Sequence, residues 1–288
     1  MLEMIIKPKR AERRPWEMFF IGLIYSSIAL LVVSFVFSWD SVLSKYSGIL
    51  LVLLTVLACL PFMYYIIKLE EGKDLEINDQ GQLVKEHWKA LKALMWLFLG
   101  FVIGFSFWYI VLPAQTATSF NAQIEIFCSI NSPNNYVNCL EQNGISAITG
   151  GATSNAEFTL GIFSNNVRVL IVTLFFSLIF GAGAIFILVW NASVIATAIG
   201  MFAKGTLAGL PCGLFRYLIH GLPEIAAYFV AALAGGIISV AIIRKDLDGL
   251  RKWSILQDAI VLVIIALLIL LVSAVVEVYL TPQLIKIC

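Results

Sequence analysis

Polar side chains are rare in the long apolar stretches of this chain of 288 residues, and a few of them have the types and spacing to do chemistry. His220, one of only two histidines, precedes Glu224 by four residues and follows Arg216 by four. On one continuous helix these three side chains would share a face. A carboxylate near a histidine favours its charged form, whereas desolvation opposes it, so this pair would be a proton-sensitive element.

The residues between them also permit a second interpretation. Gly221 and Pro223 argue against a continuous helix, because proline is favoured in the first turn of a helix. A glutamate in that first turn complements the positive helix end. In this interpretation Glu224 begins a membrane span and His220 only closes the preceding loop. The sequence leaves both interpretations open.

Further polar residues lie at membrane depth, where they are costly and usually face the interior of a bundle. We therefore predict an intramembrane polar site from the candidates Asn165, Asn166, Arg168, Asn191, His220 and Glu224. Lys204, Arg216 and Glu277 are additional polar residues in the same stretches.

Motifs of soluble active sites are not found. The stretch from His220 to Glu224 is not the His-Glu-x-x-His motif of zinc proteases, and the chain has neither a glycine-rich phosphate loop nor a nucleophile elbow. Cys59, Cys212 and Cys288 are too scattered for a zinc site. The other histidine, His87, is expected on the surface of an amphipathic cytoplasmic segment. We expect no catalytic residue, no metal, no cofactor and no enzymatic activity.

The composition is that of a membrane protein, with 60% hydrophobic and 13% charged residues. A net charge of +1 argues against a nucleic-acid partner. About 20 apolar residues cross a bilayer, so the uncharged runs mark candidate spans. These runs are Met18–Trp39, Tyr46–Ile67, Ala93–Ile124, Val169–Ala203, Ile225–Ile243 and Ala259–Val276.

Two of these runs are too long for one span. The first should end its helix near Leu112 and Pro113, and the second should break at Asn191. Residues 191–223 would then form one interrupted crossing of half-helices, a feature that builds substrate or ion sites in transporters. Its break and packing residues are Gly205, Gly209, Pro211, Gly213, Gly221 and Pro223. The predicted fold is an all-α, polytopic membrane bundle of about seven crossings.

The distribution of Lys and Arg predicts the orientation. No Lys or Arg occurs between Lys92 and Arg168, so this interval belongs outside, and the basic N-terminus belongs in the cytoplasm. Seven crossings then place the C-terminus outside a multi-pass protein of the cell membrane. The outer loop contains Cys128 and Cys139, which we expect to form a disulfide. The predicted divisions are residues 1–113, the outer loop 114–156, a membrane core 157–243, and a cytoplasmic loop with a last span, 244–288.

Residues 157–243 resemble the stage II sporulation protein M family. The matching pieces, in order, are Ile162–Asn166 with Arg168, Gly181–Gly183 with Asn191, Ile219–Gly221 with Glu224, and the small-residue run Ala231–Gly236. The chain departs from the family pattern at Ile219, where proline is usual, and at Ala192, where glycine is usual. The resemblance implies a helical integral membrane protein with Asn166, Asn191, His220 and Glu224 as signature positions. In spore formers the namesake is thought to anchor cell-wall hydrolases.

Two functions follow from these expectations. In the first, the polar residues converge on a small cavity and the protein moves an ion or small solute. In the second, they lock helix ends together in a membrane scaffold that anchors partner proteins. The expected partners are the lipid bilayer and either further copies of the chain or other membrane proteins.

Overall fold

The computed structural model describes residues 8–40, 42–77, 80–131, 139, 155–180, 185–203, 206–243 and 251–284. These residues form helices and no strands. The elements are α1 (Pro8–Arg13), α2 (Glu17–Phe35), η2 (Phe37–Trp39), η3 (Leu43–Tyr46), α3 (Ser47–Glu76), α4 (Gln80–Val111), α5 (Pro113–Ser119), α6 (Asn121–Asn131), α8 (Asn155–Phe180), α9 (Ile185–Phe202), η6 (Leu207–Gly209), α10 (Leu210–Ile243), α11 (Arg251–Val275), the π-helical segment η7 (Val276–Leu280) and α12 (Thr281–Leu284).

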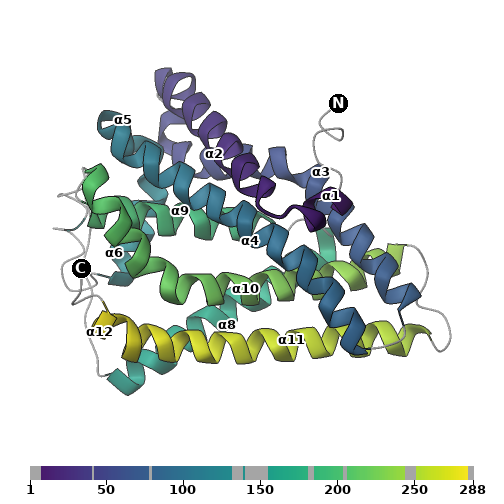
Figure 1. Cartoon of the computed structure of the whole chain (residues 1–288). Coiled ribbons are helices and arrows are strands. Elements are labelled where there is room, and N and C mark those ends of the chain that lie inside the picture. Colours follow the sequence, from purple (N-terminus) through teal and green to yellow (C-terminus); the bar gives the residue numbers. More distant parts are fainter. Residues whose placement is uncertain are drawn as a thin grey trace.

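Seven helices of the described chain are long and apolar enough to cross a membrane, which confirms the predicted bundle. They are α2, α3, α4, α8, α9, α10 and α11 with its π-helical extension. Figure 1 shows α5, α6 and α12 gathered at one end of the bundle and α1 at the other. The short helices therefore mark the two ends of the spanning helices.

The boundaries of the fourth to sixth spans differ from those predicted. Asn191 does not break a helix but lies inside α9, which runs from Ile185 to Phe202. The chain is interrupted instead between α9 and α10, where η6 spans Leu207–Gly209. The helices on both sides of that interruption are each long enough to cross the membrane. Gly205 lies outside the described residues.

Gly221 and Pro223 do not interrupt the sixth span, because α10 continues through both from Leu210 to Ile243. Proline lacks the N–H that would bond the carbonyl four residues earlier, but membrane helices tolerate this where neighbours satisfy the freed backbone. Close to this point, the hydroxyl of Ser273 of α11 donates a 2.8 Å hydrogen bond to the backbone carbonyl of His220, three residues before Pro223, and so ties α10 to α11. The interpretation in which Glu224 begins a span is therefore wrong.

Two of the predicted packing glycines, Gly209 and Gly213, allow close approaches around the α9–α10 connection. A Cβ atom built on Gly209 would lie 2.8 Å from Cα of Ala203, and one on Gly213 would lie 3.1 Å from a side-chain carbon of Ile199. Gly213 thus packs α10 directly on α9, whereas Gly209 in η6 lets the connection fold back closely on Ala203, just after α9. Pro211 lies in the first turn of α10, where a missing N–H costs nothing.

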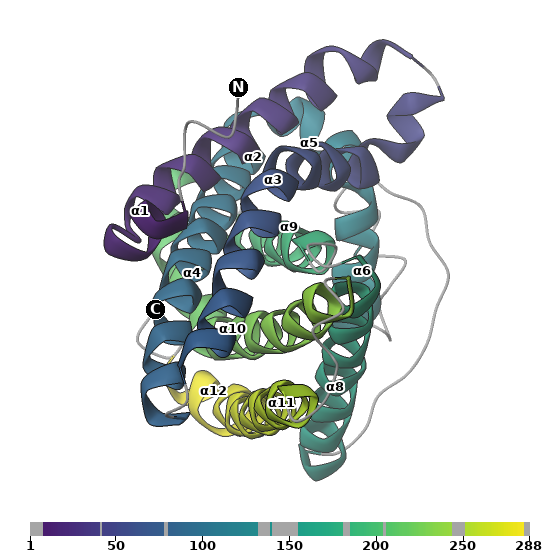
Figure 2. The same cartoon turned by 90° about the vertical axis from the view of Figure 1, so that its right-hand side faces the viewer.

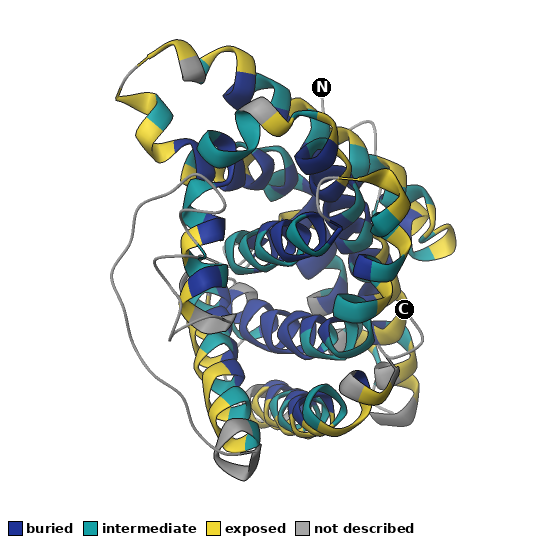
Figure 3. Ribbon diagram, turned by 90° about the vertical axis from the view of Figure 1, so that its left-hand side faces the viewer, coloured by how far each residue is buried: buried dark blue, intermediate teal, exposed yellow. Residues whose placement is uncertain are grey.

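The spanning helices differ in the fraction of their residues that is buried. Within an apolar stretch of 18 residues in each helix, 67% of the residues of α10 are buried but only 17% of those of α8. Figure 3 shows the buried residues on the faces that the helices turn toward one another, and the exposed residues on the outer faces. α10 is therefore a central helix, which α8, α9 and α11 surround as its main neighbours (Figure 2).

The predicted outer loop begins as ordered structure. Two helices, α5 and α6, follow the end of α4 at Val111, where proline was expected to stop it. Cys128 of α6 forms a disulfide with Cys139, as predicted. The side chain of Gln123 ties α6 to the bundle by donating hydrogen bonds to the Gly48 carbonyl and the Ser193 hydroxyl.

Candidate functional site

A cluster of polar side chains lies between α8, α10 and the end of α11. We call it the α10–α11 cluster and define it as Asn166, His220, Glu224, Tyr228, Glu277 and Thr281. Its α10 members recur every four residues and so lie on one side of the helix. Tyr228 donates a 2.7 Å hydrogen bond from its hydroxyl to Oε1 of Glu224.

His220 is oriented toward the C-terminal part of the chain. Its Nδ1 lies 3.4 Å from the Thr281 hydroxyl, and its Nε2 lies 4.0 Å from Oε1 of Glu277. Glu277 belongs to the π-helical segment Val276–Leu280. Single π-helical turns are rare and occur frequently at functional sites, because the wide turn redirects a side chain. Here the wide turn carries the carboxylate that faces His220.

The acidic groups of this cluster lack strong cationic partners. Among the described residues, no lysine or arginine nitrogen lies within 4.0 Å of a carboxylate oxygen of Glu224 or Glu277. Arg216, one turn from His220, lies over the rings of Phe202 and Tyr217, at 4.9 and 5.8 Å from their centroids. The cluster therefore has an excess of acidic groups at membrane depth.

Asn166 contributes a buried amide to the same cluster. Its residue exposure is 5%, and its Nδ2 has no hydrogen-bond partner within the described chain. The amide lies near the Glu224 carboxylate, without a hydrogen bond of normal geometry between them. A buried donor without a partner costs about 1–3 kcal/mol, so this group is available to a ligand or a water molecule.

The structure brings together only some of the predicted site residues. Asn166, His220 and Glu224 meet, although His220 and Glu224 contact different partners. Asn165 and Arg168 are exposed on α8, although Nδ2 of Asn165 donates a 3.5 Å hydrogen bond to Oδ1 of Asn166. Asn191 donates a 2.7 Å hydrogen bond to the Ile187 carbonyl of its own helix, which leaves it outside the cluster.

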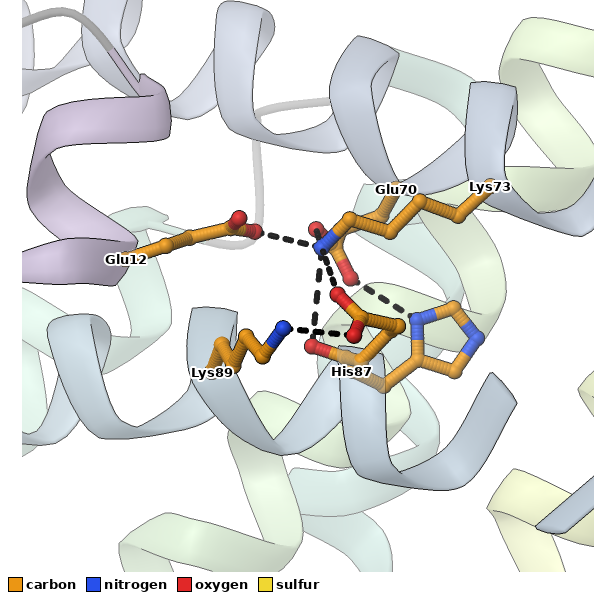
Figure 4. A network of polar contacts seen from close by, with 6 residues as sticks. Glu12, Glu70, Lys73, His87 and Lys89 are labelled. Carbon is orange, nitrogen blue, oxygen red and sulfur yellow. Dashed lines mark hydrogen bonds and ion pairs between the residues drawn. The ribbon is translucent and has the colours of Figure 1, made fainter. Parts of the chain in front are cut away.

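A second polar cluster, the α3–α4 cluster, lies near α1 and consists of Glu12, Glu70, Lys73, Glu86 and His87 (Figure 4). Nζ of Lys73 lies 2.6 Å from Oε1 of Glu12 and 2.7 Å from Oε1 of Glu70. The other Glu70 oxygen, Oε2, lies 2.8 Å from Nδ1 of His87. His87 is only 5% exposed, so its expected surface position is wrong.

Burial and charge act together on two groups of this cluster that lie outside the spans. Burial and the neighbouring Glu70 carboxylate raise the pKa of Glu12 to about 7, although Lys73 opposes this shift. Burial lowers the pKa of Lys73, but its hydrogen bonds to Glu12 and Glu70 outweigh this, so the net shift is upward. Lys73 therefore stays charged and holds the carboxylates together.

Comparison with known proteins places the whole bundle in one family. A family model described as Stage II sporulation protein M matches residues 27–282. The chain belongs to this family. The match extends well beyond residues 157–243, where the sequence motifs lie, and includes Glu70, His87 and Glu277. In this Stage II sporulation protein M family member, both polar clusters thus fall largely within the family region.

A relative also matches part of the chain. An uncharacterised protein of Methanocaldococcus jannaschii is 30% identical over 135 residues, which cover 45% of this chain and 74% of the relative. No solved structure matches the chain.

Sequence reasoning missed several members of the two clusters. Tyr228 carried a usable signal, because it follows Glu224 by four residues. Glu70 and Lys73 follow an apolar run at a spacing of three, which allows an ion pair on one helix. The contact of this pair with His87 across two helices left no local signal.

Proposed function

We propose that this protein binds a small cation, or a proton, at the α10–α11 cluster and moves that ion or a small solute coupled to it across the membrane. The observation that carries this proposal is the pair of carboxylates, Glu224 and Glu277, with no lysine or arginine nitrogen in contact among the described residues. Two carboxylates at membrane depth need a compensating positive charge. A bound cation or a proton supplies it.

The surrounding groups support reversible rather than permanent neutralisation. Nε2 of His220 lies 4.0 Å from Oε1 of Glu277, which is too far for a hydrogen bond. At this distance, the protonation of either group changes the electrostatic energy of the other. Asn166 and Tyr228 provide polar atoms around Glu224. Intramembrane carboxylates and histidines of this kind form ion pathways and proton relays.

The test is flux in proteoliposomes that contain the purified protein. A dye inside the vesicles reports proton movement, and isotope uptake reports Na⁺ and K⁺. Glu224→Gln and Glu277→Gln keep the side-chain shape and remove the charge, so each should reduce the flux at least tenfold. Glu125→Gln is the matched control, because Glu125 is exposed on α6. Wild-type flux no higher than that of empty vesicles would overturn the proposal.

A specific observation favours the scaffold as a second candidate. The end of the bundle that carries α5 and α6 presents exposed apolar residues, with Trp39 87% and Val42 61% exposed. Such a surface suits a partner protein. A scaffold predicts that Trp39→Ser and Val42→Ser release a co-purifying partner while Glu224→Gln has no effect. The ion proposal predicts that Glu224→Gln reduces the flux, whereas Trp39→Ser and Val42→Ser leave it unchanged.

We further propose the orientation that the basic residues predict, with the α5–α6 end outside. The disulfide of Cys128 with Cys139 supports it, since disulfides persist in oxidising compartments. Cys212 at the same end is also disulfide-bonded. A membrane-impermeant maleimide should label Ser132→Cys in intact cells and Asn78→Cys only after permeabilisation. Both positions lie outside the described residues, and labelling of Asn78→Cys in intact cells would reverse the orientation.

A further inference from the structure

A groove of about 280 Å³ lies between α4, α10 and α11, apart from the α10–α11 cluster. Nearly all of its lining is apolar, and the principal side chains are Leu91, Leu94, Phe229, Leu233, Leu262 and Ile269. These residues are buried or nearly so within the bundle, so the groove penetrates between the helices. In a membrane an apolar groove of this kind is filled by hydrocarbon rather than by water.

The groove has the length of one lipid leaflet. On α4 its lining runs from Lys85 to Leu94, nine steps along the helix, or about 14 Å at ~1.5 Å per residue. The hydrocarbon core of a bilayer is ~30 Å thick, so this length is about that of the acyl region of one leaflet. It therefore fits a single acyl chain that enters from one leaflet.

The surface end of the groove is basic. Lys85 lines this end, is exposed, and has no ion-pair partner among the described residues. Lys92 lies two turns further along α4, with its Nζ 5.5 Å from the ring centroid of Trp88, and Trp88 is 53% exposed. An exposed tryptophan with lysines is typical of the membrane interface, where basic residues between helices bind anionic head groups.

The other polar lining residue does not compete for a head group. His87 lies in the groove wall, but its Nδ1 contacts Glu70 at 2.8 Å within the α3–α4 cluster. Lys89, between Lys85 and Lys92 on the same helix, pairs with Glu86. Among the described residues, Lys85 is thus the lysine in the groove lining that is left to bind a phosphate.

We propose that the groove is a binding site for one anionic glycerophospholipid, with an acyl chain between α4, α10 and α11 and its phosphate at Lys85. This site is independent of ion movement at the α10–α11 cluster. It requires only that the N-terminal end of α4 lies at a membrane surface. The bound lipid would join α4 to α11, which otherwise make few direct contacts.

Native mass spectrometry of the delipidated protein tests the proposal. Phosphatidylglycerol and phosphatidylcholine with identical acyl chains are titrated separately, and the fraction with one bound lipid is measured. We expect the wild type to bind phosphatidylglycerol at least fivefold more tightly. Lys85→Gln should remove this preference, whereas Lys68→Gln, the matched change at an exposed lysine of α3, should retain it.

A second pair of variants tests the acyl-chain site itself. Leu233→Trp fills the groove and should abolish retention of either lipid, whereas Ile264→Trp on the exposed face of α11 should retain both. Leu91→Trp replaces Leu233→Trp if the latter lowers the thermal unfolding temperature. Equal binding of the two lipids by the wild type, or an unchanged preference in Lys85→Gln, would overturn the proposal, as would full lipid retention in a folded groove-filling variant.

Discussion

The two polar clusters of this bundle differ in whether their carboxylates contact a lysine. In the α3–α4 cluster, Lys73 contacts both Glu12 and Glu70 at 2.6–2.7 Å, and Glu70 also contacts His87. In the α10–α11 cluster, the hydrogen bond to Glu224 within the described chain comes from the Tyr228 hydroxyl, and Glu277 lies 4.0 Å from His220. The first cluster lies near α1 and the second near α12, at opposite ends in Figure 1.

We propose that this difference separates a structural use of charge from a functional one. A buried ion pair with short contacts holds its helices in a fixed arrangement, and removing one partner exposes the full desolvation cost of the other. A buried carboxylate without a fixed cation leaves that role to a mobile ion. The α3–α4 cluster thus joins α1, α3 and α4, whereas the α10–α11 cluster is suited to an exchangeable charge.

The largest expected effect is the loss of Glu70. Glu70→Ala leaves Lys73 and His87 without their shared buried carboxylate, and breaking a buried pair costs ~3–5 kcal/mol. Thermal unfolding in detergent should therefore shift strongly downward. Glu86→Gln is the control, because its carboxylate is partly exposed and lies 3.7 Å from Lys73. If the two variants unfold at similar temperatures, the α3–α4 cluster has no structural role.

The second effect is the coupling of His220 to Glu277 rather than to Glu224. Residues in contact show coupling energies of ~0.5–3 kcal/mol, whereas independent residues add within ~0.5 kcal/mol. A double-mutant cycle of His220→Gln with Glu277→Gln should therefore be non-additive in unfolding free energy. The cycle of His220→Gln with Glu224→Gln should be additive. The opposite result would show that the α10 pair interacts directly.

Part of this contrast was predictable from the sequence. Seven crossings, the end of α4 before Pro113 and the disulfide of Cys128 with Cys139 follow from local composition and spacing, and the structure confirms them. The helix breaks were harder to place. Local rules predict a break at Pro223 because they ignore tertiary packing, whereas α10 continues through this proline while it packs on α8, α9 and α11.

Only some members of the two polar clusters could be predicted from the sequence, for a related reason. His220, Glu224 and Asn166 stand out because each is polar within an apolar run. His87 lies in a stretch rich in charge, so its 5% exposure could not be inferred without the packing of α3 on α4. Sequence patterns therefore indicate which residues are unusual, but the pairing between helices depends on the tertiary arrangement.

The third effect concerns the buried amide of Asn166. Among the described residues its Nδ2 has no partner, and its Oδ1 accepts one long hydrogen bond, 3.5 Å, from the exposed Asn165, so replacing the amide by an apolar group of similar size should be nearly neutral or stabilising. Asn166→Leu should therefore keep or slightly raise the thermal unfolding temperature, while ion flux falls because a ligand contact is lost. A clear loss of stability would mean that Asn166 has a structural partner, and the contrast with the α3–α4 cluster would weaken.

The smallest effect is a pH dependence that originates in the α3–α4 cluster. The pKa of Glu12 is raised to about 7 in the folded protein, from an ordinary value of 4.5, so folding favours its protonated form. This contribution to stability is fully present below about pH 4.5 and is lost as the pH rises through about 7. The unfolding temperature should therefore decrease between pH 5 and pH 8. Glu12→Gln, which cannot ionise, should flatten this decrease, whereas Glu76→Gln at the exposed end of α3 should leave it unchanged. An equal slope in wild type and Glu12→Gln would show that Glu12 carries its charge in the folded state throughout this range, and Lys73 would then fully compensate all of its carboxylates.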